Sequence, residues 1–213
     1  MPVPVKICGI RDREVLESAV EGGAAAVGFA FVSGSPREIS PDAAALLASG
    51  VPSGVLKVGL FVDADDKTIG RAAEASGLDV LQLHGRETPE RVAEVGRRFG
   101  YKVWKALPVA EQADVKAAFA FEGAADRLLF DSRPPKGARL PGGNARAFDW
   151  SLLAVPLPNL PWLLSGGLTA GNLREAVRIS GARAVDVSSG VERSRGVKDP
   201  VLVRAFLEEA ATL

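Results

Sequence analysis

The 213-residue sequence has very few of the side chains that form cross-links or bind metal ions, with one cysteine and one histidine in the whole chain. One cysteine cannot form a disulfide within the chain, and one cysteine with one histidine argues against a structural zinc site. Net charge is absent as well, because 26 basic residues balance 26 acidic ones. A neutral chain lacks the broad basic surface that binds nucleic acid or an anionic membrane, so neither partner is expected.

Long apolar runs are also missing. No stretch approaches the roughly 18 apolar residues that a membrane-spanning helix needs, and the N-terminus MPVPVKICGI lacks the basic and apolar segments of a signal peptide. These absences predict a cytoplasmic protein. Apolar residues make up 47% of the chain and charged residues 24%, an ordinary globular composition that excludes general disorder.

The sequence does contain short, nearly continuous apolar runs that stop at Gly, Asp or Ser, the pattern of parallel strands buried on both faces. Eight such runs cover Val3–Cys8, Ala25–Phe31, Leu56–Val62, Leu78–Leu83, Lys102–Leu107, Arg127–Asp131, Pro161–Ser165 and Ala184–Ser188. Segments with helical spacing lie between them. We therefore predict an α/β fold, a single-domain (β/α)8 TIM barrel over residues 1–213, with roughly 27 residues per unit. A doubly wound open sheet is the alternative, but the glycine fingerprint expected after its first strand is missing.

One predicted connection is unusually long. Residues 132–148, SRPPKGARLPGGNARAF, follow the sixth strand and are rich in Gly, Pro, Arg and Lys. Loops of this length inside a compact domain are usually functional or disordered, and in a barrel this one lies on the C-terminal face, where active sites sit. We predict that residues 132–148 form an active-site lid, with a passive loop as the alternative.

Polar side chains occur two residues apart in three of the apolar runs, and residues with this spacing share one face of a strand. The pairs are Lys6 with Cys8, Gln82 with His84, and Asp186 with Ser188. We predict that they point into the barrel and that the later member of each pair reaches its mouth. For the earlier members, a functional site and a hydrogen-bonded core network both remain open, because an unpaired buried polar group is costly.

Two of the strand ends carry groups that can exchange protons. Cys8 ends the first strand and Asp131 ends the sixth, so a thiol and a carboxyl on opposite sides of one mouth form a candidate base and acid. The alternative for Cys8 is a small buried apolar residue. His84 is expected to have a structural or peripheral role rather than to act as a second base.

The last two strands are followed by glycines and hydroxyl residues. Gly166 and Gly167 follow the seventh strand, and Ser188, Ser189 and Gly190 follow the eighth. Glycines let backbone N–H groups approach an anion, and the loops after strands seven and eight are the usual phosphate site of such barrels. We predict a small phosphorylated ligand here, with ordinary turn glycines as the alternative.

Taken together, these segments resemble the phosphoribosylanthranilate isomerase family over almost the whole chain. The matching stretches are Lys6–Ile10, Gly28–Phe29 through Ser35–Arg37, Val58–Val62, Leu81–Gly85, Phe130–Asp131, Phe148–Trp150, Ser165–Leu168 and Asp186–Glu192. The stretches KICGI, QLHG and DVSSGVE in this order are highly specific, although no single one would suffice.

The resemblance implies a single-domain barrel that works without a metal or organic cofactor. Its reaction is an Amadori rearrangement in tryptophan biosynthesis, from N-(5-phosphoribosyl)anthranilate to 1-(2-carboxyphenylamino)-1-deoxyribulose 5-phosphate. The family pattern implies that Cys8 is the general base, that Asp131 is the general acid and that Arg37 binds the anthranilate carboxylate. A monomer and a homodimer both remain open.

The proposed base raises a question of protonation. An ordinary thiol has a pKa of about 8.5 and is mostly protonated at neutral pH, so a lower pKa would help Cys8. Lys6, one pleat below on the same face, is the candidate for lowering it. The alternative is that Lys6 pairs with Asp186 in the core.

Two other enzyme functions are compatible with the same barrel fold. An indole-glycerol-phosphate synthase needs catalytic lysine and glutamate residues at strand ends, and a sugar-phosphate epimerase usually has metal-binding histidines; neither set is visible in this sequence. A non-catalytic phosphate-ligand binder is the alternative from another class. The presence of both Cys8 and Asp131 argues against it.

Overall fold

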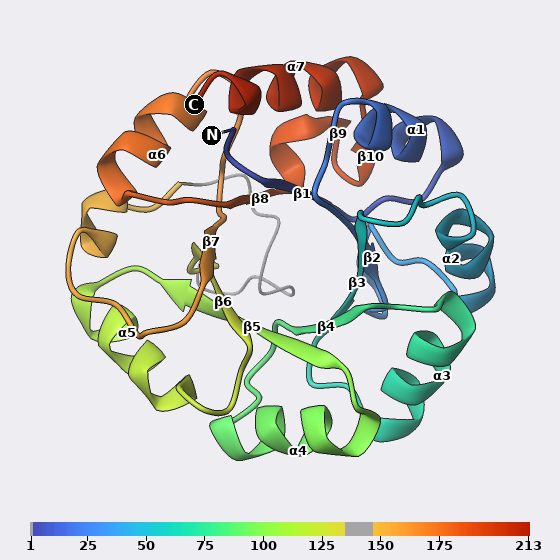
Figure 1. Cartoon of the computed structure of the whole chain (residues 1–213), viewed down its shortest axis with the longest axis horizontal. Coiled ribbons are helices and arrows are strands. Elements are labelled where there is room, and N and C mark those ends of the chain that lie inside the picture. Colours follow the sequence, from blue (N-terminus) through green and yellow to red (C-terminus); the bar gives the residue numbers. More distant parts are fainter. Residues whose placement is uncertain (1, 135–146) are drawn as a thin grey trace.

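The computed structural model of the chain describes residues 2–134 and 147–213, and within them eight parallel strands close into a barrel (Figure 1). The strands are β1 (Val5–Cys8), β2 (Ala26–Ala30), β3 (Leu56–Phe61), β4 (Val80–Leu83), β5 (Lys102–Val109), β6 (Arg127–Ser132), β7 (Trp162–Leu164) and β8 (Val185–Val187). Each strand pairs with the next, and β1 also pairs with β8. The predicted (β/α)8 barrel is confirmed, and closure excludes the open sheet.

Helices form a ring around the strands (Figure 1). They are α1 (Arg13–Glu21), α2 (Pro41–Ala48), α3 (Asp66–Ser76), α4 (Pro89–Phe99), α5 (Gln112–Ala117), α6 (Leu173–Ser180) and α7 (Pro200–Ala211), with short 3-10 turns η1 (Ala118–Phe121), η2 (Trp150–Leu153) and η3 (Ser189–Val191). Helices α2 and α4 begin where a hydroxyl precedes proline: the Ser40 and Thr88 side chains each accept a backbone N–H from the first turn. None of the helices described is long and apolar enough to cross a membrane.

The alternation of side chains along the strands divides the apolar residues into two cores. One fills the barrel and consists of Ala26, Val58, Val80, Trp104, Ala106, Leu129, Leu163 and Ala184. The larger one lies between strands and helices and includes Ile7, Leu83 and Val187. Lys6, Gln82 and Asp186 each come directly before one of these residues in a strand, so their side chains point to the opposite face, into the barrel, as predicted. All three polar side chains are buried.

A small antiparallel hairpin between β8 and α7 was not predicted. It consists of β9 (Glu192–Ser194) and β10 (Val197–Lys198), which pair through Val197 with Ser194 and Lys198 with Glu192. Its turn contains Gly196 at φ +81°, where a Cβ atom would collide with Pro36. The hairpin therefore packs directly against the loop between β2 and α2.

The long connection after β6 is described only at its two ends. Ser132 is the last residue of β6, and residues 135–146 of the predicted lid lie outside the described residues. The lid over residues 132–148 stays a prediction.

Candidate active site

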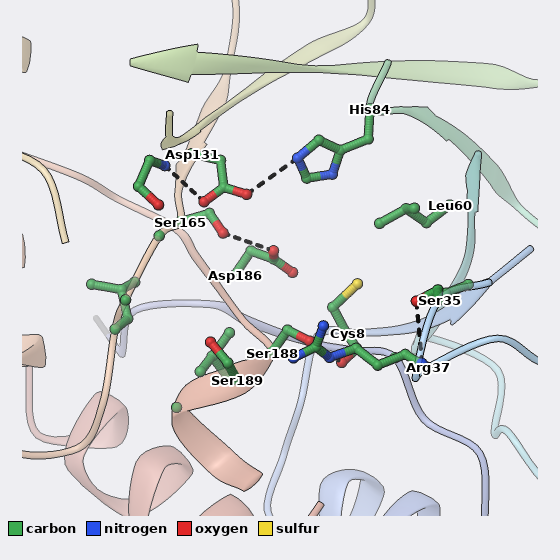
Figure 2. Close-up of a pocket in the computed structure, with 18 of the residues that line it drawn as sticks. Cys8, Ser35, Arg37, Leu60, His84, Asp131, Ser165, Asp186, Ser188 and Ser189 are labelled. Carbon is green, nitrogen blue, oxygen red and sulfur yellow. Dashed lines mark hydrogen bonds and ion pairs between the residues drawn. The ribbon is translucent and has the colours of Figure 1, made fainter. Parts of the chain in front are cut away.

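The carboxyl ends of the strands surround an open cavity with about 730 Å³ of empty space, which includes its open mouth (Figure 2). Every site residue predicted from the sequence lines it: Cys8, Arg37, Asp131, Gly166, Gly167, Ser188, Ser189 and Gly190. His84 and Asp186 also line it, whereas Lys6 and Gln82 are buried below. Figure 2 shows Asp131 and His84 on one side of this cavity and Cys8 and Arg37 on the other.

Cys8 is held at the end of β1, opposite Gly28 of β2, and is 4% exposed. A Cβ atom at Gly28 would lie 3.0 Å from the Cys8 sulfur, so the glycine makes room for the thiol. Burial raises the pKa of the Cys8 thiol above its ordinary value, although the positive charges of Lys6 and Lys198 act in the opposite direction. The side chain of Cys8 is therefore mainly in its thiol form at neutral pH.

Below Cys8, the side chain of Lys6 forms a buried ion pair. Its Nζ donates to Asp186 Oδ1 at 2.6 Å, and the Ser165 hydroxyl donates to Asp186 Oδ2 at 3.0 Å. Burial alone would lower the pKa of Lys6, but the Asp186 charge and hydrogen bond together with Cys8 outweigh burial, and the pKa is raised. Lys6 thus pairs with Asp186, as one of the two sequence alternatives had it. Its charge acts to lower the pKa of the Cys8 thiol but does not outweigh burial, so that pKa is raised and not lowered.

Both oxygens of Asp131 have a close polar neighbour. The backbone N–H of Ser132 donates to Oδ1 at 2.7 Å, and Nε2 of His84 lies 3.2 Å from Oδ2. Gln82 in turn contacts His84, with 3.2 Å between its Nε2 and the ring Nδ1. A Cβ atom at Gly166, whose φ is +88°, would collide with the Ser132 backbone N, so only glycine lets the loop after β7 pass this close to the acid. His84 therefore contacts Asp131 directly, whereas the sequence predicted a structural or peripheral role for it.

The loops after β7 and β8 meet at the edge of the cavity. Gly167 has φ +66°, and a Cβ atom at Gly190 would overlap the carbonyl oxygen of Leu168. The hydroxyl of Ser188 donates to the carbonyl oxygen of Cys8 at 3.1 Å. The glycines and serines predicted to bind an anion are thus one packed unit, joined to the end of β1.

Arg37 lies in the loop between β2 and α2, and it is 6% exposed. Its Nε and Nη2 atoms donate to the two carboxylate oxygens of Glu192 at 2.7 and 2.9 Å. Its stem packs over Gly9, where a Cβ atom would come within 2.9 Å of the Arg37 Cδ. Sequence reasoning missed Glu192 and Lys198 as site residues. The signal that could have found Glu192 is its place two residues after Ser188–Gly190, the stretch that follows β8.

The geometry can be compared with known proteins. The sequence profile of one family, described as N-(5'phosphoribosyl)anthranilate (PRA) isomerase, matches residues 5–209. The chain belongs to this family. A phosphoribosylanthranilate isomerase of Rhodospirillum centenum is 58% identical over 100% of both chains, and one of Paramagnetospirillum magneticum is 55% identical over 99% of this chain and 98% of its own.

Solved structures of phosphoribosylanthranilate isomerases share the barrel. The enzyme from Thermotoga maritima has a TM-score of 0.85 and 35% identity, with 99% of this chain and 100% of that chain covered. A second structure, in complex with reduced 1-(o-carboxyphenylamino)-1-deoxyribulose 5-phosphate, has a TM-score of 0.84, 35% identity and the same coverage.

Family membership confirms the resemblance found in the sequence. The chain is an isomerase of tryptophan biosynthesis that converts N-(5'-phosphoribosyl)anthranilate by an aldose-to-ketose rearrangement. This reaction replaces the two other enzyme reactions considered from the sequence, those of a synthase and an epimerase with the same barrel.

Proposed function

We propose that Cys8 is the general base and Asp131 the general acid of this isomerisation. The observation that carries the proposal is their placement: a thiol and a carboxyl line the same cavity from different strand ends, with the glycine–serine loops and Arg37 around them. A non-catalytic binder would need the pocket but not this pair of proton-exchanging groups.

The lining of the cavity suggests how the substrate lies. Its phosphate binds at Gly166–Gly167 and Ser188–Gly190, where backbone N–H groups and hydroxyls are available. Its aromatic ring lies against the apolar side chains of Val32, Leu60 and Val62, and its carboxylate reaches Arg37. The ribose carbons that react are then held between Cys8 and Asp131.

The first chemical step belongs to Asp131. Its carboxyl donates a proton to the furanose ring oxygen while the bond from C1′ to that oxygen breaks, and the nitrogen lone pair forms the C=N bond of a Schiff-base cation. The hydrogen bond from the Ser132 N–H and the nearby Nε2 of His84 stabilise the carboxylate that remains.

The second step belongs to Cys8. The base is the thiolate form of Cys8, the minority form at neutral pH, which has already lost its proton to solvent. The thiolate removes the proton from C2′, and the electron pair of that bond moves toward the cationic nitrogen to give an enolamine, which tautomerises to the ketone. The iminium cation already acidifies the C2′–H bond. The step therefore needs a base and a substrate that is held in place.

Three further predictions from the sequence belong to this proposal. We expect a small phosphorylated substrate, a location in the cytoplasm and an active-site lid over residues 132–148. The oligomeric state is open between monomer and homodimer. A structure of monomers generated from the dimeric Thermotoga maritima enzyme is among the similar proteins, with 35% identity. Cell fractionation and sedimentation of the purified chain check location and oligomeric state.

The test is turnover of N-(5-phosphoribosyl)anthranilate made in situ, followed by its loss of fluorescence. Cys8→Ala and Asp131→Asn should each lower kcat by about 10²- to 10⁴-fold, the usual contribution of a positioned acid or base. Both should still bind a reduced product analogue. Asp42→Asn removes an exposed carboxyl outside the cavity and serves as the control. A wild-type chain that binds the analogue but does not turn over would favour the non-catalytic binder.

A further inference from the structure

The hairpin β9–β10 places two charged side chains in the protein interior beside the cavity. Glu192 and Lys198 have side chains that are 4% and 3% exposed. The Glu192 carboxylate accepts two bonds from Arg37, one from Lys198 Nζ at 3.2 Å and one from the backbone N–H of Gly196 at 3.0 Å. Its two oxygens therefore receive four N–H donors, which holds the carboxylate in one orientation.

The pairing between Arg37 and Glu192 is bidentate. Two parallel N–H···O bonds fix the plane of a guanidinium as well as its position, and a single point contact would not. Because Arg37 also packs over Gly9, its stem and its head are both held. The guanidinium thus has a set orientation before any ligand arrives.

Charge within this cluster does not cancel. Arg37 is positive and Glu192 is negative, and Lys198 adds a second positive charge in its protonated form, although burial lowers the pKa of Lys198. With Lys198 protonated, these three described side chains together carry one net positive charge. Of the three, Arg37 is the one that lines the cavity in the described part of the chain. An anion in the cavity therefore meets this excess charge through Arg37.

Lys198 joins the cluster to the rest of the site. Its Nζ donates to the carbonyl oxygen of Ser188 at 3.0 Å, and the hydroxyl of Ser188 donates to the carbonyl oxygen of Cys8. The hairpin thereby links the loop that carries Arg37, the predicted phosphate loop and the end of β1. All of these parts contact the same substrate in the arrangement proposed above.

We propose that Glu192 is a positioning residue for substrate recognition, which fixes the Arg37 guanidinium for the aromatic carboxylate, and that Lys198 offsets the charge of Glu192. Without Lys198, the Arg37–Glu192 pair would be neutral and would attract a carboxylate weakly. With it, the cluster keeps one positive charge for the substrate. This inference rests on the proposed function, since it requires Arg37 to bind the carboxylate.

Electrostatics and positioning predict opposite effects for one substitution. Glu192→Gln removes a negative charge next to Arg37, so charge alone would tighten binding of a carboxylate. If Glu192 acts by holding the guanidinium, the same substitution weakens that binding, because a misplaced contact loses the benefit of orientation. The sign of the change in KM therefore separates the two mechanisms.

The experiment compares two substrates, N-(5-phosphoribosyl)anthranilate and N-(5-phosphoribosyl)aniline, which lacks the carboxylate. Glu192→Gln should raise KM for the first by about 10- to 100-fold, with a small change in kcat. It should leave KM for the second near the wild-type value. Glu192→Asp, which keeps the charge on a shorter side chain, should restore part of the loss. Lys198→Met should raise KM for the carboxylated substrate alone, and Glu94→Gln, in an exposed ion pair with Arg91, is the control.

Two outcomes would overturn the inference, and a third concerns the function itself. Equal loss on both substrates in Glu192→Gln would show a merely structural role, and tighter binding of the carboxylated substrate would show a charge effect without positioning. Should Glu192→Gln not fold, Glu192→Asp decides by the same comparison. If Arg37→Ala lowers activity equally on both substrates, the carboxylate-binding role of Arg37 fails, whatever Glu192 does.

Discussion

Nε2 of His84 lies 3.2 Å from Oδ2 of Asp131, which joins the single histidine of the chain to the proposed acid. The Gln82 side-chain amide contacts the other ring nitrogen of His84. The two ring nitrogens of His84 therefore face different partners, with Nδ1 toward the Gln82 amide and Nε2 toward Asp131. The three residues form a short chain from the barrel interior to the cavity.

Removal of the His84 ring should slow the acid step. We expect His84→Ala to lower kcat by about 10- to 100-fold, because the Asp131 carboxylate loses the polar ring nitrogen that lies 3.2 Å from its Oδ2, and a polar contact to a charged group is worth about 1.5–3 kcal/mol. KM should change little, since no part of the proposed substrate position depends on this ring. Steady-state kinetics with His84→Gln alongside checks this: partial recovery in the amide variant supports orientation by a donor, and an unchanged kcat in both variants would contradict it.

The raised pKa of the Cys8 thiol predicts a base-limited pH profile. Because burial raises this pKa, the thiolate fraction and kcat/KM should increase as pH rises above neutral. The double variant Lys6→Met/Asp186→Asn removes both charges next to Cys8. Because the positive charge of Lys6 affects the Cys8 pKa more than the negative charge of Asp186, this pKa should rise further.

Alkylation of Cys8 by iodoacetamide, measured against pH, reports this pKa directly. The double variant avoids leaving one buried charge unpaired, which would destabilise the fold by about 3–5 kcal/mol. Lys57→Met, outside the cavity, is the control. The same apparent pKa in wild type and double variant would show that Lys6 does not tune the thiol.

Arg127 is expected to contribute to stability and not to catalysis. Its guanidinium lies 4.9 Å from the centre of the Trp104 ring, and it begins β6, four residues before Asp131. That spacing places it roughly 13 Å down the strand from the cavity. Arg127→Ala should lower the free energy of unfolding by about 1–2 kcal/mol, the range for a partly desolvated cation–π contact. Urea denaturation checks this against Arg178→Ala on an exposed helix face, and kcat should stay at the wild-type value.

Acid should weaken the Arg37–Glu192 pairing. Burial would raise the pKa of Glu192, but hydrogen bonds from Arg37 and the nearby Lys198 charge outweigh it, so this pKa lies below the ordinary value of 4.5. A carboxyl with a lowered folded-state pKa stabilises the fold above the unfolded value, and this contribution is lost as pH falls through the folded value. The free energy of unfolding of wild type should therefore drop more steeply below about pH 4.5 than that of Glu192→Gln. Parallel slopes in urea denaturation at several pH values would refute the contribution.

The strands and the inward-facing residues could be predicted because they depend on local alternation. Each near-continuous apolar run became a strand within two residues of its predicted limits, although β1 begins at Val5 rather than Val3. The hairpin β9–β10 was not predicted, because its sequence, ERSRGVK over Glu192–Lys198, is short and charged and shows no apolar period. Its stability comes from tertiary contacts, such as the packing of Gly196 on Pro36.

The sequence by itself determined the fold class and which residues face the cavity, because a period of two residues fixes the face on which a strand side chain lies. The direction of Cys8 was found in this way, whereas Asp131 and the glycine–serine loops were found from their places at the ends of strands. The tertiary structure decided the partners: Arg37 binds Glu192, which is 155 positions away, and His84 contacts Asp131 from another strand. Barrel closure and loop packing set such neighbours, and no local period encodes the distance between side chains on different strands.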